Sequence, residues 1–444
     1  MNAKTAAAKR EPGDRLALDW ILDSVLDGRT KGWPPQKPAA RVRDVAAIGL
    51  NLFRGDLPTP VAILRHHALH INSSWMRRFL QRTGAVVCPH GKTTMAPQLF
   101  ARQLDDGAWG ITVATRQQLE IALRAGVRRL ILANQLVAPS DMDWVAAELD
   151  RDPALELYLY VDSIELVKRW AEVRRRRPGR PIELLLEIGF AAGRTGARTD
   201  AEAVEVAERI RAEPRLRLRG IAGFEGLIRG DSPALAAECV RAFLGLIVKT
   251  AEDCARRGLF ADEPVILTAG GSAYYDLVAE VFSKVDLGRP SRVVLRSGCY
   301  LTHDHQMYAT YVEDIIARSS IVPTQSVRPT PALEVWASVQ SVPEPGLAIC
   351  SVGKRDISFD VHLPIPVAWC RLGRDRESQP LEGHVVTGLN DQHAMVRQPA
   401  DSPLRVGDLV GFGISHPCTT FDRWPLLYVI DEGGTVLEGV RTFF

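Results

Sequence analysis

From Val86 to Pro97 the sequence reads VVCPHGKTTMAP. It begins with an apolar run, residues 85–87, whose β-branched side chains predict a buried strand. Pro89 ends that strand, because proline lacks an amide hydrogen and disfavours helix in the residue before it. Lys92 follows, and we expect a helix to begin one or two residues later. Lys92 is thus expected at the carboxyl end of a strand, where α/β barrels assemble their active sites.

Two interpretations of Lys92 follow from this segment alone. A lysine at such an edge can lose its hydration, which lowers its pKa and makes the amine able to form a Schiff base. Most lysines, however, are solvated surface groups. The segment leaves both interpretations open.

Length and composition limit the classes of protein that fit. The chain has 444 residues, 46% of them apolar, which suits a large core and more than one ordinary domain. A net charge of only +2 does not point to nucleic acid or an anionic membrane as a partner. The seven cysteines are scattered and odd in number, which favours a reduced, cytoplasmic protein. No apolar stretch is long enough to span a membrane.

From residue 59 to about 295, apolar strand patterns alternate with helical patterns. The expected strands are residues 85–88, 109–113, 129–133, 155–161, 182–188, 216–222, 264–269 and 292–295. The expected helices between them are 115–125, 140–149, 163–177, 200–212 and 234–257. Such alternation predicts parallel strands, and eight units in about 240 residues match a (β/α)8 barrel. A doubly wound open sheet is the alternative, but no G-x-G-x-x-G follows the first strand.

The sequence divides into three parts. Residues 1–58 form an N-terminal extension, with an amphipathic helix from Leu16 to Gly28 and a proline-rich connection, and we expect it to pack on the last part. Residues 59–320 form the barrel. Residues 321–444 carry closely spaced prolines and short β-rich runs, which predict an antiparallel β domain.

Two glycine-containing turns follow the last two expected barrel strands, where many barrels bind phosphate. Their candidate ligands, acting mainly through backbone N–H groups, are Gly270, Gly271, Ser272, Gly298, Cys299 and Tyr300. Either turn alone is weak evidence for a phosphate site, because such sequences are ordinary turns. Together with a lysine on the first strand they suggest a lysine-bound phosphate cofactor, and pyridoxal phosphate fits best.

Two further motifs carry chemical groups. Arg194 lies between two glycines after the fifth strand, where it could bind a cofactor oxygen or a substrate carboxylate, or simply face water. His416 and Cys418 follow a predicted strand and, in extended conformation, could both point to one face. Imidazole and thiolate suit Zn²⁺, and two protein ligands leave open positions, as in a catalytic rather than a structural site.

The motif PHGKT at residues 89–93 resembles the cofactor-lysine motif of the D-threonine aldolase and D-serine dehydratase group. These are fold-type III pyridoxal phosphate enzymes, related to alanine racemase. Further matching segments, in the same order, are 109–115, 133–135, 193–196, 298–300, 388–393 and the H-x-C at 416–418. The resemblance covers about residues 55–444. It implies that Lys92 and His90 contact the cofactor and that His416 and Cys418 bind a divalent metal, zinc or alternatively manganese.

The chain also departs from the family pattern. The loop at 189–193 is about one residue longer, and where aldolases carry a histidine after strand six this chain has GFEG at 223–226. Retro-aldol cleavage thereby loses its usual base. Dehydration needs only removal of the Cα proton, for which Lys92 can serve, and Lewis-acid help for the departing hydroxyl group. Glu225 could fill part of the gap.

The sequence therefore predicts a lyase that dehydrates D-3-hydroxy amino acids, such as D-serine or D-threonine, to a 2-oxo acid and ammonia. One alternative is an aldolase that gives glycine and an aldehyde. A non-catalytic pyridoxal phosphate-binding protein is a second, against which the β domain argues. The resemblance also implies a homodimer in which the barrel of one subunit faces the β domain of the other.

Overall fold

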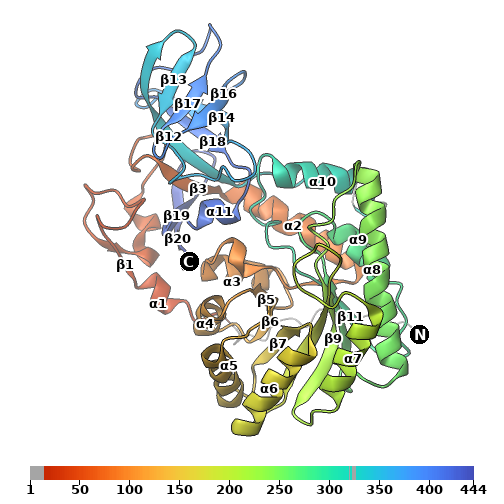
Figure 1. The fold of residues 1–444 in the computed structure, drawn as a ribbon. Coiled ribbons are helices and arrows are strands. Elements are labelled where there is room, and N and C mark those ends of the chain that lie inside the picture. Colours follow the sequence, from red (N-terminus) through yellow and green to blue (C-terminus); the bar gives the residue numbers. More distant parts are fainter. Residues whose placement is uncertain (1–14, 320, 323–326) are drawn as a thin grey trace.

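The structure is a computed structural model that describes residues 15–319, 321–322 and 327–444. Figure 1 shows two parts, a curled parallel sheet surrounded by helices and an antiparallel sheet that extends away from it. In the described ranges no helix is both long and apolar enough to cross a membrane.

The parallel sheet has eight strands in the order β4-β11-β10-β9-β8-β7-β6-β5. Their bounds are β4 (Val86–Val87), β5 (Ile111–Val113), β6 (Arg129–Leu132), β7 (Glu156–Val161), β8 (Ile182–Ile188), β9 (Leu216–Gly223), β10 (Val265–Ala269) and β11 (Ser291–Leu295). The two ends of this order are joined, because Trp109 N–H donates to the Val87 carbonyl at 2.7 Å and an isolated parallel bridge links His90 to Thr112. The predicted α/β barrel is confirmed.

Helices cover the outside of this sheet (Figure 1). They are α2 (His66–Thr83), α3 (Pro97–Asp105), α4 (Arg116–Arg124), α5 (Pro139–Arg151), α6 (Ile164–Arg176), α7 (Asp200–Arg211), α8 (Pro233–Arg256), α9 (Tyr275–Phe282) and α10 (Met307–Arg318). Four of them begin at a hydroxyl side chain that accepts the N–H three residues on, namely Thr115, Ser163, Thr199 and Ser232. Such N-caps explain why the expected helix starts agree with the structure to within one or two residues.

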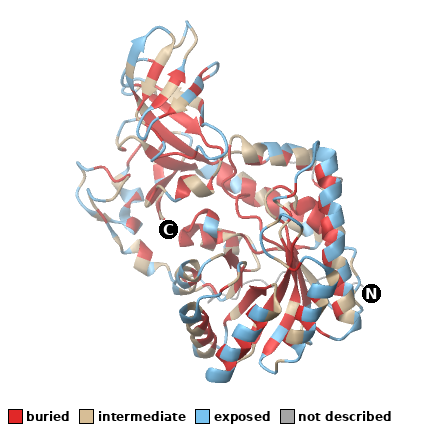
Figure 2. Ribbon diagram, in the orientation of Figure 1, coloured by how far each residue is buried: buried red, intermediate tan, exposed pale blue. Residues whose placement is uncertain are grey.

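The interior of the barrel is filled by its own side chains. Cys88, Ile131, Tyr160, Leu185 and Ile266 belong to one buried cluster there. Figure 2 shows the strands of this sheet as buried, with exposed residues on the outer helices. The barrel is therefore a packed core, and chemistry is expected only at its rim.

The antiparallel part follows α10. Its elements are β12 (Leu333–Glu344), β13 (Leu347–Cys350), β14 (Ile365–Cys370), β15 (Gln379–Pro380), β16 (Val385–Leu389), β17 (Ala394–Arg397), β18 (Leu409–Gly413), α11 (Cys418–Phe421), β19 (Leu426–Ile430) and β20 (Val436–Arg441). The strands run in the order β15-β14-β18-β12-β13-β17-β16. This agrees with the predicted C-terminal antiparallel β domain.

Strand β3 (Val61–Arg65) lies in this second sheet and not in the barrel. It pairs antiparallel with β12 and parallel with β19. The expected boundary at residue 59 therefore differs from the strand pairing, which puts the change of sheet between β3 and α2. An apolar strand pattern does not say which sheet the strand joins, because the partner strands are more than 260 residues away in sequence.

The N-terminal segment is less helical than expected. The predicted helix from Leu16 to Gly28 is wrong, since the structure has only α1 (Asp19–Leu22), followed by β1 (Val25–Leu26). β1 pairs with β2 (Ala40–Arg41), and two short 3₁₀ helices, η1 (Val42–Asp44) and η2 (Ala46–Ile48), follow. Apolar side chains of this segment, such as Trp33 and Val45, share a buried cluster with Trp336 and Tyr428 of the second sheet. Tertiary packing here overrides the helical periodicity.

Candidate active site

Lys92 lies in a tight turn at the rim of the barrel. After β4 the chain forms one 3₁₀ turn, η3 (Gly91–Thr93), in which Thr93 N–H donates to the His90 carbonyl at 3.2 Å. Met95 then has a φ of 40°, and α3 begins only at Pro97. The expectation of a helix beginning at Thr93 or Thr94 is therefore wrong, because the left-handed residue interrupts the backbone before Pro97 can start the helix.

The turn after β11 packs directly on the turn that carries Lys92. A Cβ at Gly298 would lie 2.5 Å from the His90 carbonyl oxygen and 2.7 Å from Thr93 Oγ1, so only glycine fits. The next residue, Cys299, has its Sγ 3.8 Å from the same Thr93 hydroxyl. The structure thus brings Lys92, Gly298 and Cys299 together, as the sequence predicted for the first and last strands of the barrel.

The surroundings of Lys92 lower its pKa. Burial is the main cause, and the Arg194 and Arg296 guanidiniums add to it, whereas Cys418 and Cys299 act in the opposite direction. The side chain is nevertheless accessible to solvent. Lys92 is therefore a solvent-accessible amine that is also surrounded by many protein atoms. A lysine nucleophile requires both properties.

The same cations act on His90. Its pKa lies well below the ordinary value because of burial, then because of Lys92, Arg296 and Arg194. His90 Nδ1 is buried and has no hydrogen-bond partner among the residues described. A neutral imidazole with a free nitrogen next to Lys92 is available to a ligand.

Arg194 and Arg296 make this rim electropositive. Arg194 lies over the ring of Phe224 at 4.4 Å, and within the described residues it forms no ion pair. Arg296 is buried, and its guanidinium donates to Thr268 Oγ1 at 2.8 Å and to the Gly223 carbonyl at 2.7 Å. Sequence reasoning did not propose Arg296, although it is the first residue of the turn after β11, and that position was the signal that could have found it.

Glu225 and the glycine pair form a connected unit. The Glu225 carboxylate is fully buried and accepts the N–H groups of Gly270 at 3.1 Å and Gly271 at 2.7 Å. These two amides therefore hold an anion, but it is a carboxylate of the chain itself. No interaction between Glu225 and Lys92 occurs among the described contacts, so a catalytic role of Glu225 stays a prediction.

Ser272 and Tyr300 lie on different sides of the turns. The Ser272 side chain forms a hydrogen bond with Cys299, next to Gly298. Tyr300 is buried, and its hydroxyl forms a hydrogen bond with Gln103 of α3. The structure therefore brings Ser272 toward Cys299, whereas the Tyr300 hydroxyl is directed to the helix layer.

His416 and Cys418 reach this rim from the second sheet. Cys418 Sγ lies 3.6 Å from Thr93 Oγ1, so it lies beside the residue that follows Lys92. The expectation that residues 416–418 are extended is wrong, since Pro417 has φ −58° and ψ −44° and Cys418 begins α11. The hydrogen bond with Cys418, and then Asp360, raises the pKa of His416 to about 9, and the pKa of the Cys418 thiol lies well below its ordinary value.

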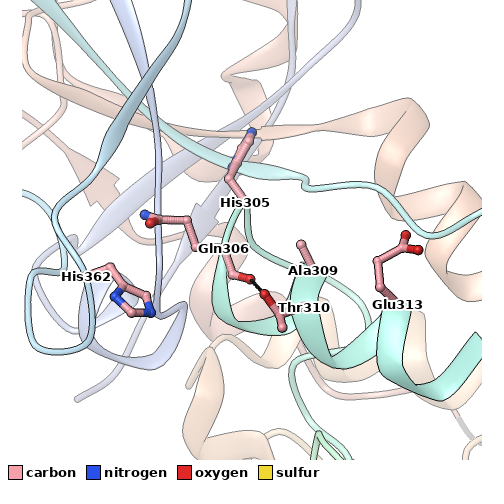
Figure 3. Close-up of a pocket in the computed structure, with 6 residues that line it drawn as sticks. All are labelled: His305, Gln306, Ala309, Thr310, Glu313 and His362. Carbon is pink, nitrogen blue, oxygen red and sulfur yellow. Dashed lines mark hydrogen bonds between the residues drawn. The ribbon is translucent and has the colours of Figure 1, made fainter. Parts of the chain in front are cut away.

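Within the ranges that the structure describes, no three His, Cys, Asp or Glu side chains are arranged to hold a metal ion. His416 and Cys418 thus remain a pair of candidate ligands. A cavity of about 450 Å³ lies elsewhere, beside the start of α10 (Figure 3). It is lined by His305, Gln306, Ala309, Thr310, Glu313 and His362 and contains none of the predicted site residues.

Comparison with protein families places this fold in a known class. Residues 64–290, more than half of the chain, match the alanine racemase N-terminal domain, and residues 332–430 match a putative serine dehydratase domain. The chain therefore belongs to the alanine racemase-like family of fold-type III pyridoxal phosphate enzymes.

Individual relatives narrow the class further. D-threonine aldolase of an Arthrobacter species is 23% identical over 379 residues, which cover 84% of this chain and 89% of the relative. D-threo-3-hydroxyaspartate dehydratase of Delftia sp. (strain HT23) is 26% identical over 393 residues, covering 86% and 96%. The crystal structure of D-threonine aldolase from Filomicrobium marinum superposes with a TM-score of 0.73 at 21% identity, over 89% of this chain and 97% of that one.

The residues present fit the cofactor that this family implies. Lys92 is an amine with a lowered pKa, His90 offers an unpartnered buried nitrogen, and Arg194 and Arg296 supply positive charge for a phosphate or phenolate. Gly270 and Gly271 hold a carboxylate already, which shows that this turn can bind an anion. A phosphate bound by these two amides would have to displace the Glu225 carboxylate, whereas phosphate contacts by Ser272, Gly298 and Cys299 would not.

Proposed function

We propose that this chain is a pyridoxal phosphate- and metal-dependent lyase that dehydrates D-3-hydroxy amino acids to a 2-oxo acid and ammonia. The observation that carries the proposal is the contact between Cys418 and Thr93. In this contact the H-x-C motif of the second sheet lies next to the turn that carries Lys92. Two solved structures of D-threo-3-hydroxyaspartate dehydratase, a histidine-to-alanine variant and a cysteine-to-alanine variant in the metal-free form, support a metal role for such a motif.

The candidate site residues have different proposed roles in this reaction. Lys92 would hold the cofactor and, once the substrate amine has replaced it, would take the Cα proton, because its lowered pKa leaves more of the amine neutral. Arg194 would bind an anionic oxygen of the cofactor or substrate. The bound cofactor supplies an electron sink for Cα. A divalent ion held by His416 and Cys418, zinc by preference and manganese as the alternative, supplies a Lewis acid for the 3-hydroxyl group.

An aldolase remains the second candidate, because D-threonine aldolase and 3-hydroxy-D-aspartate aldolase are among the relatives. Against it stands the sequence after β9, where Phe224 and Glu225 occupy the region of the histidine expected in aldolases. Glu225 is held by two glycine amides and cannot replace that base without moving. A non-catalytic pyridoxal phosphate-binding protein is disfavoured by the match of residues 332–430 to a serine dehydratase domain.

We also propose a homodimer. Its support is a row of exposed apolar side chains at alternate positions, Phe359, Val361, Leu363 and Ile365, close to Asp360 and His416. A cytoplasmic location is proposed as well, since all seven cysteines are free thiols.

Product analysis tests the proposed function. The purified protein, loaded with pyridoxal phosphate and Zn²⁺, is given D-serine, D-threonine and D-threo-3-hydroxyaspartate, with the L-enantiomers as controls. We expect 2-oxo acid and ammonia in equal amounts from a D-substrate, and loss of this activity on chelation while the cofactor stays bound. Glycine with an aldehyde as product would establish the aldolase instead, and inertness toward all three would refute a lyase of this class.

A further inference from the structure

Asp360 contacts the Nδ1 atom of His416, the candidate metal-binding histidine. Its Oδ2 lies 2.6 Å from His416 Nδ1, and its Oδ1 accepts the Thr419 hydroxyl at 2.7 Å. His416 and Thr419 stand on either side of Cys418 in the sequence. One carboxylate therefore fixes both flanks of the H-x-C motif.

This contact decides which ring nitrogen is free. When Nδ1 carries the proton that it donates to Asp360, the neutral imidazole keeps its lone pair on Nε2. A metal-binding histidine whose other nitrogen donates to a carboxylate is a recurrent arrangement, because the carboxylate fixes the tautomer and ring orientation and makes the ligand more basic.

The loop that carries Asp360 is itself anchored on both sides. Ser415 donates to the His362 carbonyl at 2.9 Å, and the Ser358 hydroxyl accepts the His416 N–H at 3.3 Å. From the barrel, Gln306 donates to the Leu363 carbonyl at 2.8 Å. Figure 3 shows Gln306 pointing toward the segment that carries His362. Asp360 is thus held in place relative to the barrel as well as to its own sheet.

We propose that Asp360 is a positioning residue, which orients His416 so that Nε2 faces the metal beside Cys418. The inference rests on the proposed function, because it assumes that the H-x-C pair binds a metal. The sequence offered no signal for it, since Asp360 and His416 are 56 residues apart.

The test measures metal binding in the absence of substrate. Zn²⁺ affinity is determined by competition with a chromophoric chelator for the wild type and for Asp360→Asn, His416→Ala and Asp401→Asn. Asp401 is an exposed aspartate of the same domain and serves as the matched control. The midpoint of thermal unfolding is measured alongside, because a merely structural carboxylate would change that midpoint and not the affinity.

We expect Asp360→Asn to weaken Zn²⁺ binding by about 10- to 100-fold at an almost unchanged midpoint. His416→Ala should bind more weakly still, and Asp401→Asn should bind like the wild type. Wild-type affinity in Asp360→Asn, together with loss of binding in His416→Ala, overturns the role of Asp360 and leaves the proposed metal site intact. If the wild type binds no Zn²⁺, or His416→Ala binds it normally, the metal part of the proposed function and this inference fall together.

Discussion

Arg194 acts on Lys92 through its positive charge. Burial is the first cause of the lowered pKa of Lys92, and the Arg194 guanidinium lowers it further. Removing a nearby positive charge makes the protonated amine less costly, so Arg194→Gln should raise the pKa of Lys92. The neutral amine would then require a higher pH.

The reactivity of Lys92 in the cofactor-free protein measures this effect. Acetylation by a neutral reagent, followed by peptide mass spectrometry across a pH series, gives the pH at which half of the amine is free. We expect this midpoint to lie below that of an ordinary lysine, and to move to higher pH in Arg194→Gln. Arg211→Gln, on the exposed surface of α7, should leave it unchanged. A midpoint that stays the same in Arg194→Gln contradicts the coupling.

The site residues that could be predicted are those that carry a local motif. Lys92 follows a strand-ending proline, Arg194 lies between glycines, and His416 and Cys418 are two residues apart. Asp360 was missed because its partner His416 is 56 residues away, and no periodicity reports such a contact. Arg296 carried a positional signal as the first residue of the turn after β11, but its contacts with Thr268 and Gly223, 28 and 73 residues away, could not be read from the sequence. For the same reason the bond from Glu225 to the glycine turn, across 45 residues, was not foreseen.

Among the elements, helix starts that follow a hydroxyl N-cap were predictable, and sheet membership was not. A hydroxyl side chain before an apolar-periodic run marks a helix start within a few residues, as at Thr115 and Ser163. The choice between two sheets depends on distant strands, as β3 shows. The left-handed backbone of Met95 also shifts the start of α3 to Pro97, and a methionine in the sequence does not predict that conformation.

The close packing of the β11 turn on the Lys92 turn gives a prediction at this scale. Gly298→Ala would place a Cβ within 2.5 Å of the His90 carbonyl oxygen, so the two turns must separate. We expect a loss of about 1–3 kcal/mol in the free energy of unfolding, with weaker binding of pyridoxal phosphate. Gly245→Ala, in α8 with no atom within 4 Å of the new Cβ, should be neutral or gain up to about 1 kcal/mol. Chemical denaturation of both variants decides the matter, and equal stability of the two would refute the packing argument.

In the whole molecule, the second sheet and the C-terminal segment pack against the rim of the barrel that carries Lys92. Besides the contact of Cys418 with Thr93, Phe443 N–H donates to the Met95 carbonyl at 2.9 Å, and Gln98 donates to the Gly439 carbonyl at 2.7 Å. The segment that follows Lys92 is therefore held between the barrel and the C-terminal segment that includes β20. The barrel carries Lys92 and the two glycine-containing turns, and the second sheet carries the candidate metal ligands His416 and Cys418.

The proposed function depends above all on Lys92 as the residue that would hold the cofactor. The most direct measurement is borohydride reduction of the protein loaded with pyridoxal phosphate, followed by peptide mapping of the pyridoxyl group. We predict a single label on Lys92, and no covalent label and no turnover in Lys92→Ala. A label on any other lysine, or an unlabelled Lys92 in protein that retains activity, would contradict the proposed role of Lys92.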